Sequence, residues 1–421
     1  MGPVRGDVRG RHPVSYDWVE MFINRVAHQL LSAPELAPLI HELSLGHDAT
    51  LAVAQSARPL MAAALWAYGP RPCLMVVSGE EAAERTARAL AAWLGMDVVA
   101  RYPQRRDRPW ADVPADDAVI GARTSAIMRL AAGEACLVVA SAAALLRRVP
   151  PVGSGYFASS TFSVGDELEL ADMSRLLVGM GYEDAGDSAS VNAPGSFHVH
   201  GDAVDVFPAQ ATSPVRIEFF GDEIDRVRRM VSSTGQTIGD LEGVTVLPCR
   251  EIALTSETIG AARKALYHRA LDSTKVAADL ELIEQGSVAP SLDKYLVELY
   301  GSSASPIEHI SRDALVILAE PRALFDDCQR ATDEIEASAA AAHERTDGLF
   351  TPPRALDFGH QQRLSLSSLM RSGAATTAEL EVRQPSIAGS DAKLLSRVRQ
   401  LTQDGSSVVP CPTARHARRW S

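Results

Sequence analysis

Apolar residues between positions 50 and 150 follow two patterns that alternate along the chain. Continuous apolar runs, such as Cys73–Val77 and Cys136–Ala140, are typical of strands in a sheet that is covered on both faces. Between such runs, the apolar residues of 60–68, 81–94 and 119–131 recur three or four positions apart, which predicts helices. Strands that alternate with helices at this spacing predict a parallel α/β sheet.

Capping residues mark where several of these helices begin and end. Ser78 and Glu81 have the spacing of a capping box before the helix that Gly95 ends. Ser141 is expected to cap a further helix, and the two prolines at 150–151 are expected to end it.

The pattern changes after residue 155, where shorter alternating segments rich in turn residues begin. Val215–Phe220 alternates apolar and polar residues, and Gly221-Asp222 predicts a hairpin turn into Ile224–Val231. These features predict a small α+β domain that is inserted into the α/β fold.

Helical patterns return at 258–300, and Ala314–Ala319 is another continuous apolar run before an alanine-rich helix at 322–345. We interpret that run as the same α/β sheet, resumed after the insertion. The expected organisation is a disordered extension at 1–20, the first part of the α/β domain at 21–157, the inserted domain at 158–251, the return and completion of the α/β domain at 252–371, a linker at 372–390, and the truncated start of a further α/β unit at 391–421.

Composition restricts the classes of function. A net charge of −12 argues against strong nonspecific binding to DNA, and no apolar run has the ~18 residues that a membrane span requires. The five cysteines lack the spacing of a zinc or redox motif, so we expect reduced thiols in a cytoplasmic protein. None of the four lysines follows a glycine, which excludes an intact P-loop: Lys264, Lys275, Lys294, Lys393.

Two halves of a nucleotide site are recognisable by position and degraded in chemistry. The loop where a P-loop would lie lacks glycines, and it carries Pro59 in place of a hydroxyl that could bind Mg²⁺. After the strand at 314–318, Ala319 replaces the acidic residue of a Walker B motif, and Glu320 follows. The pattern therefore predicts an NTPase-like fold without the reaction, in which the degenerate site comprises Gln55, Ser56, Ala57, Arg58, Pro59 and Glu320.

The segment 197–207 offers a second candidate site. His198, His200 and Asp202 are two positions apart, which would place all three on one face of an extended strand, as in a metal site. Ala203 stands where metallo-hydrolases of the His-x-His-x-Asp-His type carry their last histidine. We therefore favour a solvated strand face that contacts a partner, and expect no metal or other cofactor.

Four sequence motifs follow one another in the inserted domain: Leu177–Tyr182, Pro194–Phe197, Gly201–Pro208 and Pro214–Ile224. This ordered series resembles the UvrB-homology module at the N-terminus of the bacterial transcription-repair coupling factor (Mfd), and the resemblance extends over about 21–410. It implies a degenerate α/β NTPase fold whose inserted domain recruits UvrA in transcription-coupled nucleotide excision repair, with the ATP-driven translocase absent. It also implies a partner-binding surface at Tyr182, Glu183, Phe197, His198, His200 and Asp202.

Two departures from the family pattern affect this surface. The family places an arginine before the glycine where this chain has His200, and acidic residues, Glu183 first, follow the Gly-Tyr pair where relatives carry another arginine. Because a neutral histidine lacks the permanent charge and planar fork of arginine, the expected contact with UvrA is weakened. The alternatives are residual nucleotide binding, metal-dependent hydrolysis at His198, His200 and Asp202, or a nonfunctional remnant.

Overall fold

The chain divides into two compact units, which are described separately. The computed structural model describes residues 16–111, 113, 115–186, 191–287, 291–355, 360–368, 377–381 and 391–403. The smaller unit comprises Met1–Pro70, Arg85–Val99 and Leu364–Ser421, and the larger comprises Arg71–Glu84 and Ala100–Arg363. Seven strands form the α/β sheet: β15-β1-β14, in this order, belong mainly to the smaller unit, and β13-β2-β4-β3 mainly to the larger.

The smaller unit is built on strand β1, which pairs in parallel with both β14 and β15. Strand β15 lies inside the range expected to be a linker, and α1 begins before the end of the expected extension. Of the further α/β unit expected at 391–421, residues 404–421 lie outside the described residues. The elements are α1 (Tyr16–Leu31), η1 (Pro34–Leu36), α2 (Ala37–Ser44), β1 (Ala49–Val53), η2 (Gln55–Ala57), α3 (Arg58–Tyr68), β14 (Gln362–Ser367), β15 (Ala378–Leu380) and α11 (Asp391–Gln403).

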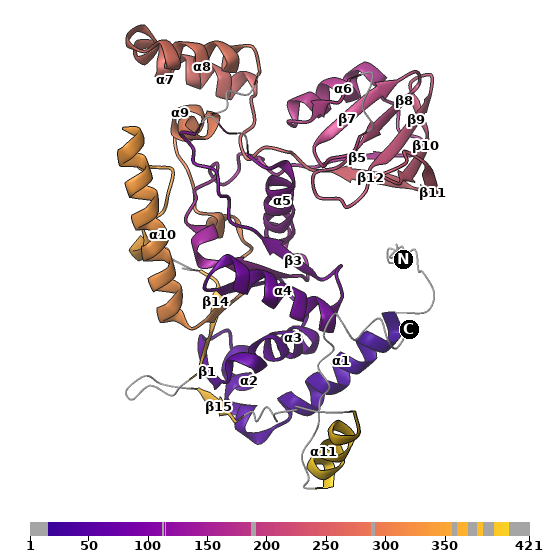
Figure 1. The fold of residues 1–421 in the computed structure, drawn as a ribbon, viewed down its shortest axis with the longest axis vertical. Coiled ribbons are helices and arrows are strands. Elements are labelled where there is room, and N and C mark those ends of the chain that lie inside the picture. Colours follow the sequence, from indigo (N-terminus) through magenta and orange to yellow (C-terminus); the bar gives the residue numbers. More distant parts are fainter. Residues whose placement is uncertain are drawn as a thin grey trace, which may run out of the picture. The chain divides into compact units, whose positions relative to one another are not determined.

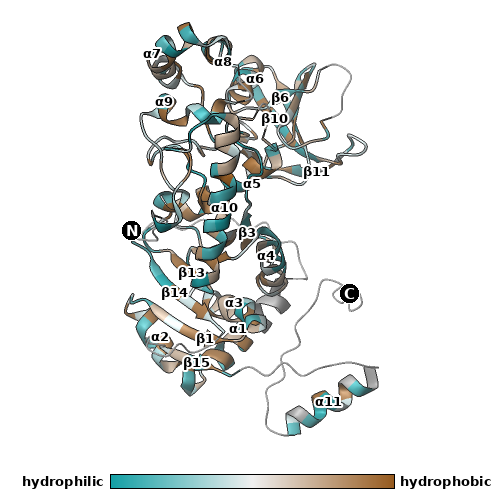
Figure 2. Cartoon of the chain, turned by 60° about the vertical axis from the view of Figure 1, so that its left-hand side comes forward, coloured by the Kyte–Doolittle hydropathy of each residue, from teal (hydrophilic) through white to brown (hydrophobic). Residues whose placement is uncertain are grey.

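The larger unit contains the parallel strands that the continuous apolar runs predicted. Strand β2 pairs in parallel with β13 on one side and β4 on the other, and every residue of β2 and β4 is buried. Burial on both faces explains why these strands are apolar without alternation, and Figure 2 shows hydrophobic residues gathered on β13. The elements are β2 (Cys73–Val77), β3 (Val99–Tyr102), α5 (Asp117–Ala131), β4 (Leu137–Ser141), β13 (Leu315–Ala319) and α10 (Pro321–Ala342). Helix α4 (Glu80–Leu94) begins in this unit, and its residues from Arg85 onward belong to the smaller unit.

The prediction of a helix from Ser141 to the prolines at 150–151 is wrong. Ser141 does cap a helix, through a hydrogen bond from the Ala144 N–H, but that helix is the single 3-10 turn η3 (Ala142–Leu145). Beyond it, the backbone of Arg148 donates to Leu349 O and that of Val149 to Ala304 O, at 2.9 Å each. Since these groups pair with distant segments, they are not used in an α-helix.

The inserted region forms its own layered fold (Figure 1). Six strands form a sheet in the order β11-β10-β9-β8-β7-β6, and the predicted β9–β10 hairpin is confirmed, with Gly221 at φ 66° in its turn. Helix α6 buries Met173 and Leu177 in the core on one face of this sheet. The elements are β5 (Ser160–Ser163), α6 (Leu170–Gly179), β6 (Glu183–Asp184), β7 (Ser196–His200), β8 (Ala203–Val206), β9 (Val215–Phe220), β10 (Glu223–Met230), β11 (Thr237–Leu241) and β12 (Gly243–Val246).

A helical segment follows the inserted region and has a core of its own, which includes Leu266, Ile283 and Tyr295. Among the residues that the structure describes, no helix has the length and apolar character needed to cross a membrane. The elements of this segment are α7 (Ser256–Asp272), α8 (Thr274–Glu284), η4 (Leu292–Tyr295), α9 (Leu296–Tyr300), η5 (Pro306–His309) and η6 (Pro353–Ala355).

Candidate partner-binding face

The loop in the position of a P-loop is closed by its own backbone hydrogen bonds. It forms the 3-10 turn η2, in which Ala57 N–H donates to Ala54 O at 3.0 Å and Arg58 N–H donates to Gln55 O. Pro59 has no N–H to donate. The N–H groups of Ala57 and Arg58 are therefore not free to bind phosphate as those of a P-loop are.

Arg58, the one cation expected in this loop, is buried at 5% exposure. Its Nη2 donates to Ser368 Oγ at 2.6 Å. Glu320 directly follows β13, at φ 55° in the left-handed region, and belongs to the larger unit. Its assignment with residues 55–59 to one degenerate nucleotide site stays a prediction.

The predicted extended strand through His198, His200 and Asp202 is wrong at its last residue. Strand β7 ends at His200, the chain turns at Gly201 (φ 59°) and Asp202, and β8 returns antiparallel to β7. A glycine with positive φ and an adjacent aspartate are typical of a tight hairpin turn, so Asp202 lies in the turn. Within the described ranges, no group of three or more His, Cys, Asp or Glu side chains is placed to hold a metal ion.

The two histidines instead lie side by side on the face of the sheet opposite the core. Their rings stack with centroids 5.8 Å apart. His198 Nδ1 lies 3.5 Å from Asp184 Oδ1, and His200 Nε2 lies 3.2 Å from Asp205 Oδ2. Each imidazole therefore has a carboxylate beside it on a neighbouring strand.

Arginine–carboxylate pairs continue this polar surface across the next strands. Asp205 and Arg216 lie directly opposite each other on β8 and β9, and both oxygens of Asp205 accept from Arg216, at 2.7 Å each. Arg228 on β10 donates to Glu218 on β9. We call this surface the open face and define it as His198, His200, Asp205, Arg216, Glu218 and Arg228.

The other residues expected at the partner surface divide by exposure. Glu183 and Asp202 are exposed, whereas Tyr182 and Phe197 are each only 2% exposed and belong to the core of the inserted region. The Tyr182 hydroxyl donates to Leu247 O at 2.9 Å and accepts from Ala209 N–H at 3.0 Å. Tyr182 and Phe197 therefore shape this region from inside and offer almost no surface to a partner.

Comparison with known proteins identifies the inserted region. Residues 161–251 match the UvrB interaction domain family. The chain is 28% identical over 365 residues to the transcription-repair-coupling factor of Myxococcus xanthus, which covers 82% of this chain and 30% of the relative. It is 28% identical over 279 residues to the Bacillus subtilis (strain 168) transcription-repair-coupling factor, covering 63% of this chain and 23% of that protein.

A second group of relatives consists of proteins named UvrABC system protein B. The UvrABC system protein B of Methanobrevibacter smithii is 26% identical over 220 residues, covering 47% of this chain and 33% of that protein. These similarities confirm the predicted resemblance to both protein groups. The chain spans a third or less of the length of each of these three relatives.

Helix α5 carries the UvrB interaction domain against the α/β part of the larger unit. A Cβ added to Gly121 on α5 would lie 2.6 Å from the Ala209 Cβ and closer still to the Ala209 carbonyl group. One turn further on, Thr124 Oγ1 lies 3.5 Å from Pro248 O, while its nearer acceptors are Ile120 O at 3.0 Å and Gly121 O at 3.1 Å in the same helix. Only a residue without a side chain permits this approach of helix and loop.

The N-terminus of α5 brings acidic groups together at the same contact. Asp116 caps the helix by accepting from Ala118 and Val119 N–H. Burial, with added repulsion from Glu183 and Asp116, raises the pKa of Asp117 from 3.8 to about 6, although Arg250 opposes the shift. Asp117 is therefore ionised at neutral pH at a cost to stability.

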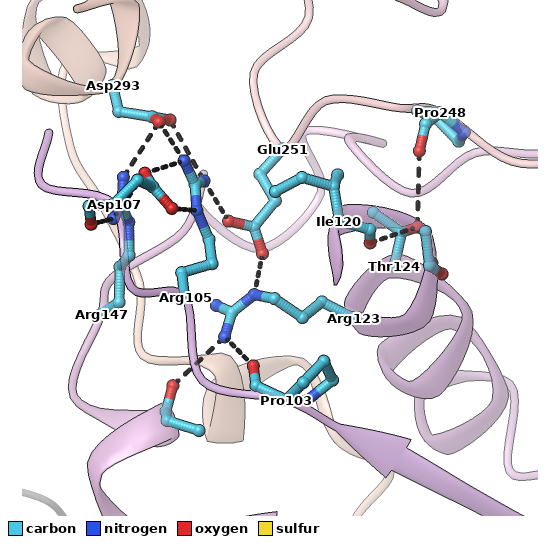
Figure 3. Close-up of polar contacts among 12 residues, drawn as sticks. Pro103, Arg105, Asp107, Ile120, Arg123, Thr124, Arg147, Pro248, Glu251 and Asp293 are labelled. Atoms are coloured by element: carbon cyan, nitrogen blue, oxygen red, sulfur yellow. Dashed lines mark hydrogen bonds and ion pairs between the residues drawn. The ribbon is translucent and has the colours of Figure 1, made fainter. Parts of the chain in front are cut away.

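A buried group of charged side chains lies where the UvrB interaction domain rejoins the chain (Figure 3). Glu251 accepts from Arg105 Nη1 at 2.8 Å and from Arg123 Nε at 2.7 Å, and it is 4% exposed. Arg105 also donates to Asp107 and Asp293, and Arg147 Nη2 donates to Asp293 at 2.9 Å. We call this set the buried ion cluster and define it as Arg105, Asp107, Arg123, Arg147, Glu251 and Asp293.

The pKa values of the acids show that the cluster is ionised at neutral pH. Burial would raise the pKa of Glu251, but Arg123 and Arg105 outweigh burial and hold it below its ordinary value. Burial acts on Asp107 in the same way, yet the hydrogen bond from Arg105 and the charge of Arg147 lower its pKa to about 2. Three arginines and three carboxylates therefore balance in charge inside the molecule.

Sequence reasoning missed this cluster, although one signal for it was present. On α5, Arg123 shares a helical face with Ile120, Ile127 and Leu130, all of which are buried. A charged residue on the apolar face of a helix indicates a buried charge, because such a position otherwise belongs to the core.

Proposed function

We propose that the chain is a nonenzymatic partner-binding module for nucleotide excision repair, in which the UvrB interaction domain recruits UvrA. The observation that carries the proposal is the match of 161–251 to that domain family. Similarity to a transcription-repair-coupling factor over 82% of the chain supports the same pathway. We propose the open face, flanked by the exposed Glu183 and Asp202, as the surface that UvrA contacts.

The chemistry of the open face suits a reversible protein contact. Its arginines and carboxylates are already paired across neighbouring strands, so a partner meets side chains that are held in place. The arginine side chains of these pairs are 26% and 28% exposed, so water lowers the cost of separating them. A partner that presents its own charged groups can therefore exchange them for the existing pairs and gain orientation and specificity.

A nonenzymatic role is supported by the backbone of the degenerate loop. The donors of Ala57 and Arg58 are used within η2, and the Arg58 guanidinium is bonded to Ser368. A calorimetric titration of the full chain with Mg²⁺-ATP tests this part of the proposal. Heat of binding at millimolar nucleotide, or release of phosphate, would contradict it.

The recruitment claim is tested by the affinity of the full chain for purified UvrA. We expect Arg216→Ala to weaken binding about 10-fold or more, since it removes a paired charge from the centre of the open face. His200→Arg is expected to strengthen binding, because it adds a permanent charge and a planar fork. Glu242→Gln changes an exposed residue of the same domain and serves as the control.

Each outcome of this experiment has a defined meaning. If neither the parent chain nor His200→Arg binds UvrA, the recruitment claim fails. If UvrA binds the parent and the Arg216→Ala variant equally, recruitment holds and the open face is the wrong surface.

A further inference from the structure

The buried ion cluster joins three segments that are far apart in the sequence. Arg105, Asp107, Arg123 and Arg147 come from the α/β part, Glu251 is the last residue of the UvrB interaction domain, and Asp293 lies in η4 of the helical segment. Arg105 is the central member, since its guanidinium contacts carboxylates from all three segments: Asp107, Glu251 and Asp293.

The contacts of Glu251 fix the orientation of its carboxylate as well as its distance from Arg105 and Arg123. One oxygen accepts from Arg105 and the other from Arg123, so the carboxylate is held between two guanidinium groups (Figure 3). Arg123 is itself fixed, because its Nη1 donates to Pro103 O at 3.0 Å and its guanidinium lies 4.1 Å from the centre of the Tyr102 ring. Planar groups paired in this way permit little rotation, unlike an apolar contact that can slide.

Glu251 lies where the chain leaves the UvrB interaction domain, so restricting its rotation also restricts the domain. The UvrB interaction domain has its own core, which includes Val204, Ile217 and Ile224, so its fold does not depend on the cluster. The chain leaves that domain through Pro248, Cys249, Arg250 and Glu251. Fixing Glu251 therefore fixes the path of the returning chain.

The contact of α5 with the domain supplies a second fixed point. Gly121 lies against the Ala209 backbone, and one turn further on Thr124 Oγ1 lies 3.5 Å from Pro248 O. A body that is held at one point can rotate about it, whereas two separate points remove most of that freedom. Helix α5 takes part in both, because it also carries Arg123.

We propose that Arg105 and Glu251 are positioning residues that hold the UvrB interaction domain in one orientation on the α/β part. The domain then offers a partner a surface of fixed orientation. The paired guanidinium and carboxylate groups of the buried ion cluster restrict its rotation. This inference concerns the chain alone and holds whether or not UvrA is the partner.

The test uses charge-conserving variants, so that folding is preserved. Glu251→Asp shortens the side chain by one methylene, and Arg105→Lys replaces the fork with a single ammonium group. Spin labels are placed at two exposed positions of the larger unit, Asp222→Cys on the β9–β10 turn and Glu336→Cys on α10. The background carries Cys411→Ser, since the other four cysteines are buried.

Pulsed electron spin resonance then gives the distribution of distances between the labels. We expect one narrow distribution for the parent and at least a doubling of its width in Glu251→Asp and Arg105→Lys, with an unchanged circular dichroism spectrum. Val139→Ala removes core contacts from β4, where Val139 is fully buried, and controls for loss of stability alone. Distributions as narrow as the parent's in both cluster variants, or equal broadening in Val139→Ala, would overturn the proposal.

Discussion

The open face and the buried ion cluster use the same chemistry in opposite surroundings. Both pair arginines with carboxylates, through Arg216–Asp205 on the face and Arg105–Glu251 in the cluster. The Arg216 side chain is 26% exposed and that of Asp205 is 9% exposed, whereas Arg105 and Glu251 are 2% and 4% exposed. Water can therefore reach the arginine of the first pair, but it hardly reaches either partner of the second. The same pair is therefore exchangeable in one place and structural in the other.

The largest effect is expected in the buried ion cluster. Glu251→Gln leaves Arg105 and Arg123 with one fewer buried carboxylate, which should lower the free energy of unfolding by about 3–5 kcal/mol. Urea unfolding measures the change, and Glu242→Gln, at an exposed position, should stay within about 0.5 kcal/mol of the parent. A loss below about 1 kcal/mol for Glu251→Gln would mean that the two regions do not differ as described.

A second variant tests the contact that accompanies the cluster. Gly121→Ala places a Cβ against the Ala209 carbonyl group, and the resulting displacement should cost about 1–3 kcal/mol. The matched control is Gly260→Ala on α7, where an added Cβ has nothing within 4 Å. It should stabilise the chain by about 0.5–1 kcal/mol, because alanine is the better helix former. Thermal unfolding that shifts in the same direction for both variants would contradict the close contact.

Asp117 gives a smaller effect that depends on pH. Its pKa in the folded chain, about 6, lies above its ordinary value of 3.8, so ionisation destabilises the fold. The cost appears as the pH rises from about 4 to about 6 and is complete above that range. Asp117→Asn should therefore stabilise the chain at pH 7.5 by about 1 kcal/mol or less, after allowance for screening at this partly exposed site.

The measurement is the difference in Tm between Asp117→Asn and the parent at pH 4 and at pH 7.5. Asp116 provides the cap of α5, so the substitution leaves that cap in place. A difference that is the same at both values would show that Asp117 does not titrate as described.

A comparably small effect on stability is expected on the open face. Arg216→Ala should lower the free energy of unfolding by about 1 kcal/mol, because His200 Nε2 still lies 3.2 Å from the mostly buried Asp205 carboxylate, although the variant should weaken partner binding strongly. Arg175→Ala on α6 is a matched control, because Arg175 forms an exposed ion pair with Asp172 in the same domain. If both variants reduce binding to UvrA equally, the effect is not specific to the open face.

Local sequence patterns predicted the parallel strands and the hairpin. Burial on both faces of a sheet requires a continuous apolar run, and a tight turn requires particular residues, so both are visible in consecutive positions of the sequence. Cys73–Val77 has the predicted bounds, and Gly221 turns the hairpin between β9 and β10. The helix after Ser141 was wrong, since Arg148 and Val149 pair with segments that follow them by 150 residues or more. The residues around 141–150 therefore carry no sign of these long-range hydrogen bonds.

The candidate site was predicted only in part for the same reason. The motif series identified the domain, and the placement of His198 and His200 in one strand is as expected. The alternation rule, however, continued one residue past the turn at Gly201 and placed Asp202 in the strand. The buried ion cluster was missed because its members span residues 105 to 293, and only Arg123, on the apolar face of α5, carried a local signal of burial.

The close approach at Gly121 has a consequence for exchanging parts between related proteins. The added Cβ meets the carbonyl carbon and oxygen of Ala209 as well as its side chain. Since the main chain is the same for every residue type, this contact recognises the path of the loop more than the identity of residue 209. A UvrB interaction domain taken from a relative should therefore fit onto α5 when its loop follows the same course, whereas position 121 of the recipient has to stay glycine.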